Sequence, residues 1–371
     1  MAKNILVIAN SISGLYSFRK EVVKAIREAG YDVSISVPEE PSKADYYNFF
    51  REIGCDVIFT TFDRRGMNPM ADFRLMLTYR KLMKQLKPLA VLTYTIKPNV
   101  YGGIACRLTQ TPQLANVTGL GDAVENGGWL KKVTITLYRL GLAKAHRVFF
   151  QNESNRSFCL RAGIANKESI LLPGSGVNLH YHAYQSYPKE DGKIRFLYIG
   201  RILKDKGVEE LFEAAKTIKA KYHQVEFQVI SDFVDEKYRA QINELENNKI
   251  INYMGIRMDV RPYIGAVECT IMPSYHEGMS NVNLESAANG RPVITTNVPG
   301  CKETVDNDRT GYLVDAKNAQ SLISAIERFI ALPYDKKLVM GQEARKKMEK
   351  EFDRQIVVNA YLNNIAQIAH V

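Results

Sequence analysis

Residues 195–221 read RFLYIGRILKDKGVEELFEAAKTIKAK and contain a complete strand–turn–helix unit. The run 195–199 is rich in aromatic and β-branched residues, which is typical of a strand. Gly200 opens a turn, and from Val208 onward apolar residues recur three and four positions apart, which predicts an amphipathic helix over 208–221. Such a turn directs backbone N–H groups and the positive end of the helix dipole towards the carboxyl end of the strand.

The same alternation extends along the chain in both directions. The strands that it predicts are 4–9, 32–37, 56–59, 90–95, 148–151, 169–172, 195–199, 226–230, 250–253, 269–272 and 292–296. The helices that it predicts are 18–29, 71–86, 129–147, 208–221, 238–247, 259–265, 281–289 and 318–331. The turn-forming residues 173–176 separate two such series. We therefore expect an α/β protein with two tandem, Rossmann-like, doubly wound parallel-sheet domains, and a ligand in the cleft between them.

Composition excludes several classes of protein. The chain has 371 residues, enough for about two domains. Hydrophobic residues make up 46% and charged residues 24%, so a disordered or fibrous protein is excluded. No apolar run approaches the ~20 residues that span a bilayer, so we expect contact with a membrane only from outside. The five cysteines include no C-x-x-C pair, which indicates free thiols in a reducing cytoplasm.

The positive charge is concentrated in the first half. Residues 1–175 hold 24 Lys and Arg against 14 Asp and Glu, whereas 176–371 hold 26 of each. Two basic stretches, 64–87 and 129–147, also show helical periodicity. In the second, Trp129, Val133 and Leu140 belong to an apolar stripe between basic residues. A helix of this kind either binds anionic lipid or is an ordinary surface helix whose stripe packs on the core.

The usual nucleotide-binding fingerprints are missing. The loop after the first strand has one glycine, Gly14, where a dinucleotide fold needs three, and no P-loop occurs. This disfavours an oxidoreductase or a P-loop kinase. The pair Gly119 and Gly121 lacks a third glycine, and we expect no strand directly before it. In the second half, Arg201 and Lys206 add two cations to the Gly200 turn, an arrangement that suits a diphosphate or is simply a solvated loop.

Two carboxylates follow the strand 269–272. Glu277 lies in the strand-to-helix turn, Ser280 is the expected N-cap, and Glu285 falls within the first two helical turns. Both acids can face the crevice and flank the backbone amides of residues 278–281. Carboxylates accept hydrogen bonds from sugar hydroxyls, and amides bind phosphate or hydroxyl oxygens. The alternative is a capping acid and an ordinary helix acid.

These motifs, together with the stretch 290–314, resemble the retaining glycosyltransferases of family 4, which have the GT-B fold. The first half resembles bacterial enzymes of capsule, O-antigen and glycan assembly, through Arg19 and the segments 118–121 and 151–155. The resemblance implies an acceptor-binding and membrane-facing domain over 1–175 and a nucleotide-sugar-binding domain over 176–352. It also implies a final helix over 353–371 that crosses back onto the first domain.

The resemblance further implies a role for each motif. Arg201 and Lys206 would hold the donor diphosphate, and Glu277 would bind hydroxyls of the transferred sugar as the third catalytic residue. Glu285 would bind the ribose hydroxyls. The other residues implied in donor binding are Ser13, Gly14, Gly200, Arg257, Gly278, Met279, Ser280 and Asn281, and those on the acceptor side are Gly119, Gly121 and Asp122.

Two departures from the family pattern limit this assignment. Many relatives place a histidine on the first domain near the anomeric carbon, where this chain has residues 118–121. The contact from that side would come from a backbone carbonyl or from Asp122. Relatives also carry a glycine-rich turn after the second strand of the second domain, where this chain has Ser231 and Asp232.

The resemblance implies a metal-independent reaction with no cofactor, in which the departing diphosphate accepts the proton of the acceptor. The string Asp306-Asn307-Asp308 matches a metal-binding pattern of other glycosyltransferases, but its neighbours predict a turn. No metal site is expected at His180, His182 or His276, for which packing or ordinary hydrogen bonding is expected.

The expected function is the transfer of a hexose or N-acetylhexosamine from a UDP-sugar to a polyprenyl-diphosphate-linked saccharide in surface glycan biosynthesis. The expected location is the cytoplasm, on the inner face of the cytoplasmic membrane, with an anionic membrane surface as partner and no nucleic acid. One alternative is an enzyme like UDP-N-acetylglucosamine 2-epimerase on the same architecture, which needs no acceptor. The other is a non-catalytic, membrane-docked scaffold.

Overall fold

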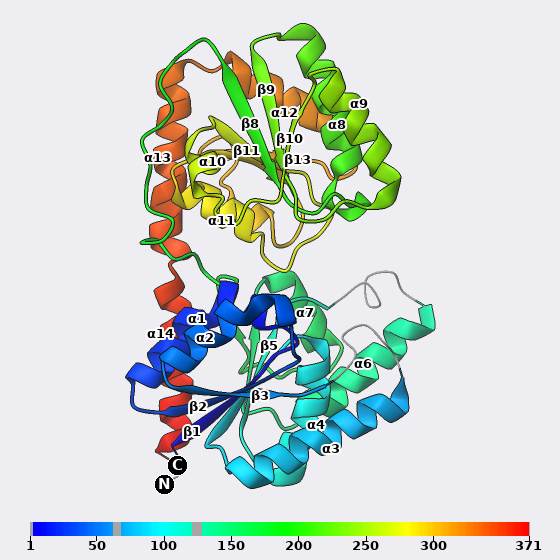
Figure 1. Ribbon diagram of the computed structural model, residues 1–371, viewed down its shortest axis with the longest axis vertical. Coiled ribbons are helices and arrows are strands. Elements are labelled where there is room, and N and C mark those ends of the chain that lie inside the picture. Colours follow the sequence, from blue (N-terminus) through cyan, green and yellow to red (C-terminus); the bar gives the residue numbers. More distant parts are fainter. Residues whose placement is uncertain (1–2, 62–67, 121–127, 371) are drawn as a thin grey trace. The chain divides into compact units, whose positions relative to one another are not determined.

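The computed structural model describes residues 3–61, 68–120 and 128–370 of the chain. It divides into two compact units, of which the first comprises Met1–Ser175 with Gln355–Val371 and the second comprises Gly176–Arg354. Each unit contains one parallel sheet covered by helices (Figure 1). The predicted α/β architecture with two parallel-sheet domains is confirmed.

The first unit is built on a seven-stranded sheet in the order β3-β2-β1-β4-β5-β6-β7. The direction of winding reverses between β1 and β4. Successive residues of β1 pack on opposite faces, since Ile5 joins the cluster under α1, α2 and α14 and Leu6 joins the cluster under α3 and α4. The elements are β1 (Asn4–Ile8), α1 (Ile12–Glu28), β2 (Asp32–Val37), η1 (Pro41–Lys43), α2 (Ala44–Glu52), β3 (Cys55–Phe59), α3 (Pro69–Leu86), β4 (Ala90–Tyr94), the π-helical η2 (Pro98–Gly102), α4 (Gly103–Thr109), β5 (Gln113–Val117), α6 (Gly128–Leu142), β6 (Arg147–Phe150), α7 (Glu153–Arg161), β7 (Ile170–Leu171) and α14 (Arg354–Ala369).

The second unit is built on a six-stranded sheet in the order β10-β9-β8-β11-β12-β13, which reverses between β8 and β11. Phe196 and Tyr198 of β8 pack in the large core under α8, α9 and α12, whereas Leu197 packs on the opposite face with Ile264 of α10. The elements are β8 (Ile194–Ile199), η3 (Lys204–Lys206), α8 (Val208–Lys221), β9 (Val225–Ile230), η4 (Glu236–Tyr238), α9 (Arg239–Asn247), β10 (Asn252–Gly255), α10 (Arg261–Gly265), β11 (Cys269–Met272), α11 (Asn281–Ala288), β12 (Val293–Thr296), η5 (Lys302–Thr304), β13 (Gly311–Val314), α12 (Ala319–Ala331) and α13 (Tyr334–Glu351).

Several predicted elements were wrong or missing. Helix α1 begins at Ile12 instead of 18, because Ser11 caps it and accepts a hydrogen bond from the Gly14 amide. Strand β5 was not predicted, so the expectation that no strand precedes Gly119 is wrong. Helices α2, α4, α7 and α13 were also not predicted. Of these helices, α7 and α13 lack strong apolar periodicity, whereas α2 is clearly amphipathic.

Helix α14 completes the first unit. The Tyr361 ring packs 4.7 Å from the Phe149 ring, and its hydroxyl accepts a 2.8 Å hydrogen bond from Asn116 Nδ2. Asn364 Oδ1 accepts a 3.1 Å hydrogen bond from Arg147. Residues 355–371 therefore belong to the core of the first unit although 179 residues of the second unit precede them.

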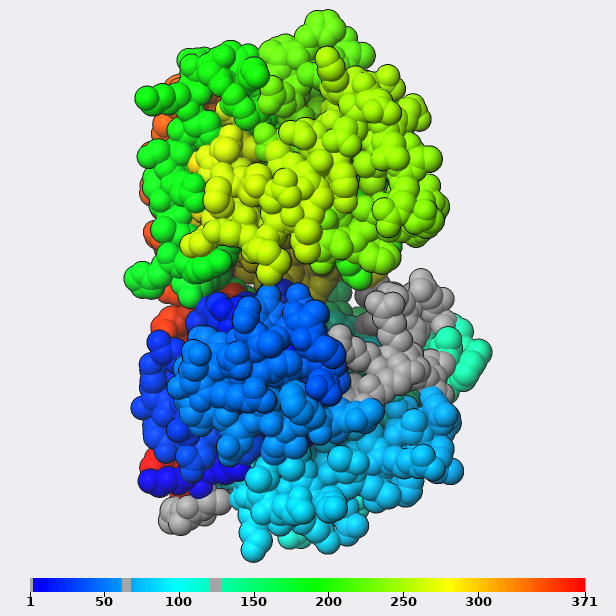
Figure 2. Space-filling model, viewed as in Figure 1, coloured from blue at the N-terminus to red at the C-terminus, as the bar shows by residue number. Residues whose placement is uncertain are grey.

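The two basic stretches of the first unit carry apolar side chains at the surface. On α6, Trp129, Val133 and Leu140 are 67%, 44% and 45% exposed, and the buried face is formed by Tyr138, Gly141 and Leu142. The interpretation that this apolar stripe packs on the core holds only in part, because Leu137 packs against the core whereas Trp129, Val133 and Leu140 are exposed. On α3, whose light-blue side chains lie on the surface seen in Figure 2, the exposed apolar residues are Met70, Phe73 and Leu77. The predicted basic residues Arg64 and Arg65 lie outside the described residues.

Candidate active site

The loops that follow β8 and β11 carry the predicted chemistry of the second unit. Ligands of doubly wound sheets bind at the carboxyl ends of the strands where the winding reverses, and β8 and β11 are the two strands that flank this reversal. The first loop contains Gly200, Arg201 and Lys206, and the second contains Glu277. The sheet order therefore brings together two segments that are about 70 residues apart.

Backbone contacts lock these two loops together. The Tyr275 N–H donates to the Asp205 carbonyl at 2.9 Å. Gly207, which precedes α8, has a φ of +70°, and a Cβ atom there would lie 2.0 Å from the Pro273 carbonyl oxygen. Only glycine permits this approach together with this backbone conformation. The distance between the two loops is therefore set by the backbone before any side chain is considered.

Lys206 and Glu277 form a direct ion pair between the loops. Lys206 Nζ lies 2.8 Å from Glu277 Oε1, and the Ser274 hydroxyl donates to the same oxygen at 2.9 Å. The two charged side chains are only 12% and 20% exposed. Desolvated charges of opposite sign hold one another in place, so both groups have a fixed orientation towards the carboxyl end of the sheet.

Arg201 belongs to the same environment although it is exposed. Its carbonyl accepts a 2.8 Å hydrogen bond from the buried Tyr198 hydroxyl, which anchors the turn. Burial, first, and then the nearby carboxylates of Glu277 and Asp205 raise the pKa of Tyr198, whereas the Arg201 cation acts in the opposite direction. Charges from both loops thus act on one buried phenol.

Helix α11 begins directly after the second loop. Ser280 is its N-cap and accepts a hydrogen bond from the Asn283 amide, as the sequence predicts. The Ser280 N–H itself donates to the Gly300 carbonyl at 2.7 Å, so this predicted ligand amide already has a partner. Met279 is 6% exposed and belongs to an apolar cluster with Leu284. Among the described residues, Asn281 Oδ1 is buried without a hydrogen-bond partner, an orphaned acceptor beside the loop.

Glu285 lies in the second turn of α11 and does not contact Lys206 or Glu277. Its Oε1 atom is 3.9 Å from His182 Nε2, and its side chain is 24% exposed. Burial raises the pKa of Glu285 to about 7, and the positive charge of Arg354 limits this rise. The carboxyl group therefore changes charge near neutral pH, where its capacity to accept hydrogen bonds changes with it.

The loops after β9 and β10 lie at the same edge of the sheet. Arg257 is exposed, and its Nε donates to the Tyr263 hydroxyl at 2.7 Å. The Ser231 amide donates to the Gly255 carbonyl, and the Ser231 hydroxyl donates to the Phe233 carbonyl at 2.6 Å. A serine turn thus occupies the position where the resemblance implied a glycine-rich turn.

The remaining predicted site residues belong to the first unit. Ser13 donates its hydroxyl to Glu40 Oε2 at 2.9 Å, and the Ile12 amide donates to Glu40 Oε1 at 2.8 Å, so a carboxylate occupies the start of α1. Gly14 donates its amide to the Ser11 hydroxyl. Gly119 follows β5, with open space where a side chain would begin. Gly121 and Asp122 lie outside the described residues.

The Asp306-Asn307-Asp308 string forms a turn. The Arg309 and Thr310 amides donate to the Asp306 carbonyl, and Asp308 has a φ of +66°. Asp306 pairs with Lys347 at 2.8 Å, and Asp308 pairs with Arg328. In the part of the chain that the structure describes, no group of three or more His, Cys, Asp or Glu residues could hold a metal ion.

Three residues of the site were not predicted in these roles. Tyr198 and Ser274 support the loops through hydrogen bonds, and His182 approaches Glu285. Tyr198 sits in an apolar strand and Ser274 in a turn, so neither differs from ordinary residues of those elements. His182 lies 103 positions before Glu285, and no local pattern connects the two.

Comparison with known proteins identifies the class of enzyme. Residues 4–152 match the family model described as "Glycosyl transferase 4-like", and residues 183–347 match the one described as "Glycosyl transferases group 1". The N,N'-diacetylbacillosaminyl-diphospho-undecaprenol alpha-1,3-N-acetylgalactosaminyltransferase of Campylobacter jejuni is 27% identical, over 96% of each chain. The UDP-Gal:alpha-D-GlcNAc-diphosphoundecaprenol alpha-1,3-galactosyltransferase of Escherichia coli is 24% identical, over 92% of this chain and 90% of its own.

A solved structure agrees with these matches. HepE of Anabaena, in complex with UDP and glucose, has a TM-score of 0.78 and 15% identity over 98% of this chain and 100% of its own. The chain is a glycosyltransferase with the GT-B fold, and each of its units matches one of the two glycosyltransferase models. The resemblance to glycosyltransferases of the GT-B fold found in the sequence is confirmed. Among the described residues, no helix combines the length and apolar character needed to cross a membrane.

Proposed function

We propose that the protein is a retaining, metal-independent glycosyltransferase. It transfers a hexose or N-acetylhexosamine from a UDP-sugar to a saccharide carried on a polyprenyl diphosphate. The observation that supports this most directly is the Lys206–Glu277 pair at the reversal point of the second sheet, where a cation and a sugar-binding acid share one loop junction. The Campylobacter and Escherichia coli relatives are named for undecaprenol-linked acceptors, and the HepE structure contains UDP.

The donor would be bound along the carboxyl ends of β8 and β11. Arg201 and Lys206 stabilise the charge that develops on the diphosphate as the sugar leaves. Glu277 accepts hydrogen bonds from sugar hydroxyls. The Gly278 and Met279 amides and Asn281 supply further polar contacts, and the orphaned Asn281 Oδ1 gains a donor from the ligand.

The ribose and the base of the nucleoside would bind to residues outside this centre. Glu285 accepts hydrogen bonds from the ribose hydroxyls, and Arg257 lies in the loop beside the base. Ser13 and Gly14 are assigned to the donor, and the Gly119 segment with Gly121 and Asp122 to the acceptor. Glu40 must release the start of α1 before Ser13 can bind a ligand oxygen.

The chemistry assigned to the site needs no enzyme nucleophile. The bond between the anomeric carbon and the diphosphate oxygen breaks, the acceptor oxygen bonds to the same face of the sugar, and the leaving diphosphate takes the acceptor proton. Glu277 Oε1 is engaged by Lys206 and Ser274, which suits a residue that positions hydroxyls. The enzyme contributes alignment and electrostatic stabilisation.

A substrate panel tests this proposal. The purified protein is incubated with UDP-sugars, with and without a polyprenyl-diphosphate-linked saccharide, in buffer with and without EDTA. We expect UDP release only with acceptor, no effect of EDTA, and a product whose anomeric configuration by NMR equals that of the donor. Consumption of UDP-N-acetylglucosamine without acceptor would instead support an epimerase, and loss of activity with EDTA would overturn metal independence. No turnover of any donor would support a scaffold.

We also propose that the first unit binds the inner face of the cytoplasmic membrane through α3 and α6. Both helices pack against α4 and η2. Each presents exposed apolar residues, Phe73 and Leu77 on α3 and Trp129 and Val133 on α6. The basic residues that accompany them are Arg74, Lys81, Lys84, Lys132, Arg139 and Lys144. Apolar side chains that enter the interface beside cations that attract anionic headgroups are typical of peripheral membrane proteins.

A further inference from the structure

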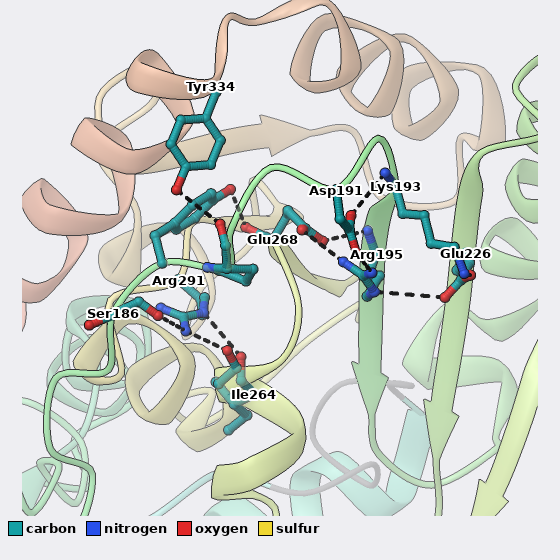
Figure 3. Close-up of polar contacts among 12 residues, drawn as sticks. Ser186, Asp191, Lys193, Arg195, Glu226, Ile264, Glu268, Arg291 and Tyr334 are labelled. Atoms are coloured by element: carbon teal, nitrogen blue, oxygen red, sulfur yellow. Dashed lines mark hydrogen bonds and ion pairs between the residues drawn. The ribbon is translucent and has the colours of Figure 1, made fainter.

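Two arginines, the buried Arg291 and the half-buried Arg345, hold the segment that enters the second unit. The Arg291 guanidinium is fully buried and donates to the carbonyls of Gln185 at 2.9 Å, Ser186 at 2.8 Å and Ile264 at 3.1 Å (Figure 3). These bonds fix the backbone of Gln185 against α10. The position of this segment is therefore determined by the fold and not by the loops of the active site.

Arg345 holds the other end of the same segment. Its Nη1 atom donates to the His182 carbonyl at 2.9 Å and to the Ala288 carbonyl at 2.8 Å. Ala288 is the last residue of α11, the helix that carries Glu285. The backbone of His182 is thus tied directly to this helix.

A chain of hydrogen bonds also fixes the orientation of the His182 ring. Gln185 Nε2 donates to the Arg261 carbonyl and, at 2.8 Å, to Asn289 Oδ1. Asn289 Nδ2 donates to the Glu285 carbonyl at 2.7 Å and lies 3.2 Å from His182 Nδ1. Because backbone carbonyls only accept hydrogen bonds, each amide has one consistent orientation. Nδ1 of His182 therefore accepts a hydrogen bond, and the ring proton of the neutral form lies on Nε2.

The protonated nitrogen faces Glu285. His182 Nε2 lies 3.9 Å from Glu285 Oε1, and His182 is 7% exposed. The other charge that acts on Glu285 is that of Arg354. The charge of His182 also lowers the pKa of Asp259, which is paired with Arg261 at 2.7 Å.

We propose that His182 is a positioning residue of the donor site, where its Nε2–H donates to the ionised Glu285 carboxylate and holds it ready to accept two ribose hydroxyls. This inference rests on the proposed function. The 3.9 Å separation closes to hydrogen-bond distance when the donor binds, as contacts in unliganded active sites commonly do. The burial that raises the pKa of Glu285 to about 7 makes such a donor necessary near neutral pH.

Two substitutions of His182 test the contributions of its two ring nitrogens separately. In His182→Asn the amide reaches about as far as Nδ1, so the contact with Asn289 remains and the donor to Glu285 is lost. In His182→Gln the amide reaches about as far as Nε2, so the donor to Glu285 remains. The experiment measures the affinity of each full-length variant for UDP by titration calorimetry between pH 6 and 9. The ionisation of UDP itself is common to all the proteins and cancels in their ratios.

We expect the Asn variant to bind UDP about fivefold more weakly than the wild type at pH 6 and nearly equally at pH 9. This follows because the pKa of about 7 arises from burial and Arg354 alone, so a hydrogen bond donated by His182 lowers the pKa of Glu285 below 7 and its loss restores about 7. The Gln variant is expected to follow the wild type throughout. Glu285→Gln is expected to bind weakly with no such dependence on pH. The melting temperature of each variant is measured alongside, and His182→Asn is expected to melt near the wild type because it keeps the contact with Asn289.

The outcomes distinguish the inference from the proposed function. A loss of affinity in the Asn variant that is equal at all pH values would show a purely structural role and overturn the inference. Identical profiles for the wild type and the Asn variant would overturn it as well, while UDP binding itself stands. A wild-type protein that does not bind UDP would overturn the proposed donor, and the inference with it.

Discussion

Lys206 and Glu277 are 71 positions apart in the sequence, yet they form one ion pair between two loops. Their placement at the same edge of the sheet could be predicted, because each follows a strand of an alternating series. The pair itself could not, since it depends on the close approach of Gly207 to Pro273. The approach of His182 to Glu285 could not be predicted either, because its partners Asn289 and Arg345 come from two distant segments.

Arg201 allows the clearest test of the donor site, because its side chain is exposed and its removal leaves no buried charge unpaired. We expect Arg201→Ala to lower the transfer rate by about 100-fold or more with an unchanged melting temperature, as for other residues that stabilise transition-state charge. Lys204→Ala, an exposed change in the same loop, is the control and is expected to keep nearly full activity. Equal rates for the two variants would exclude Arg201 from the site.

Glu285 predicts a pH dependence of stability. Its pKa is about 7 in the folded chain, above the usual 4.5. Its contribution is therefore fully present below pH 4.5 and is lost as the pH rises through 7, because only the unfolded chain ionises freely in that range. We expect Glu285→Gln to gain about 3 kcal/mol relative to the wild type between pH 4.5 and pH 8.5 in urea denaturation. A difference that does not change with pH would contradict this.

At the scale of the elements, several strands and helices with strong apolar periodicity were predicted with the right bounds. A strand that carries buried polar residues was missed. The bounds predicted for β2, α8 and β11 match the structure. Strand β5 was missed because Gln113 and Asn116 interrupt its apolar pattern. Both side chains are buried and form hydrogen bonds to Thr93 and Tyr361, which lie far away in the sequence. Such a strand is recognisable only once its neighbours are in place.

The close contact between the loops that follow β8 and β11 predicts that alanine costs more stability at Gly207 than at Gly192, although both glycines have a positive φ. Gly207→Ala would place a Cβ atom against the Pro273 carbonyl, whereas at Gly192, with a φ of +79°, a Cβ atom meets nothing within 4 Å. We expect Gly192→Ala to cost about 1 kcal/mol, and Gly207→Ala to cost several times more and to reduce transfer. Chemical denaturation and activity assays measure both. Similar costs for the two would show that the loops can separate easily.

The α6 surface predicts the strength of membrane binding. Replacement of Lys131, Lys132, Arg139 and Lys144 by Gln is expected to weaken binding to vesicles that contain phosphatidylglycerol by at least tenfold, at about 1 kcal/mol per cation near the surface. The control replaces four exposed basic residues of the second unit, Lys237, Arg239, Lys249 and Lys350, by Gln. Co-sedimentation measures both. Unchanged binding of the α6 variant would remove this helix from the membrane surface.

At the scale of the whole molecule, the chain passes from the first unit to the second and back again, so the first unit is finished only by α14. Tyr361→Phe removes one hydrogen bond to Asn116 and is expected to cost about 1 kcal/mol, whereas Tyr361→Ala should cost about 3–5 kcal/mol. Hydrogen exchange locates the effect. We expect increased exchange in β5 and β6 and unchanged exchange in β8 and β11. The reverse pattern would contradict this assignment of α14.

The chain enters the second unit at Gly176 and leaves it at Arg354, and these two points lie next to one another. Val177 and Asp353 form a parallel bridge, and the Gly176 carbonyl accepts a 2.9 Å hydrogen bond from Arg354. Residues 176–354 therefore form an insertion whose entrance and exit share a single junction. A graft of residues 176–354 into another host would therefore need both of its ends matched at this one place.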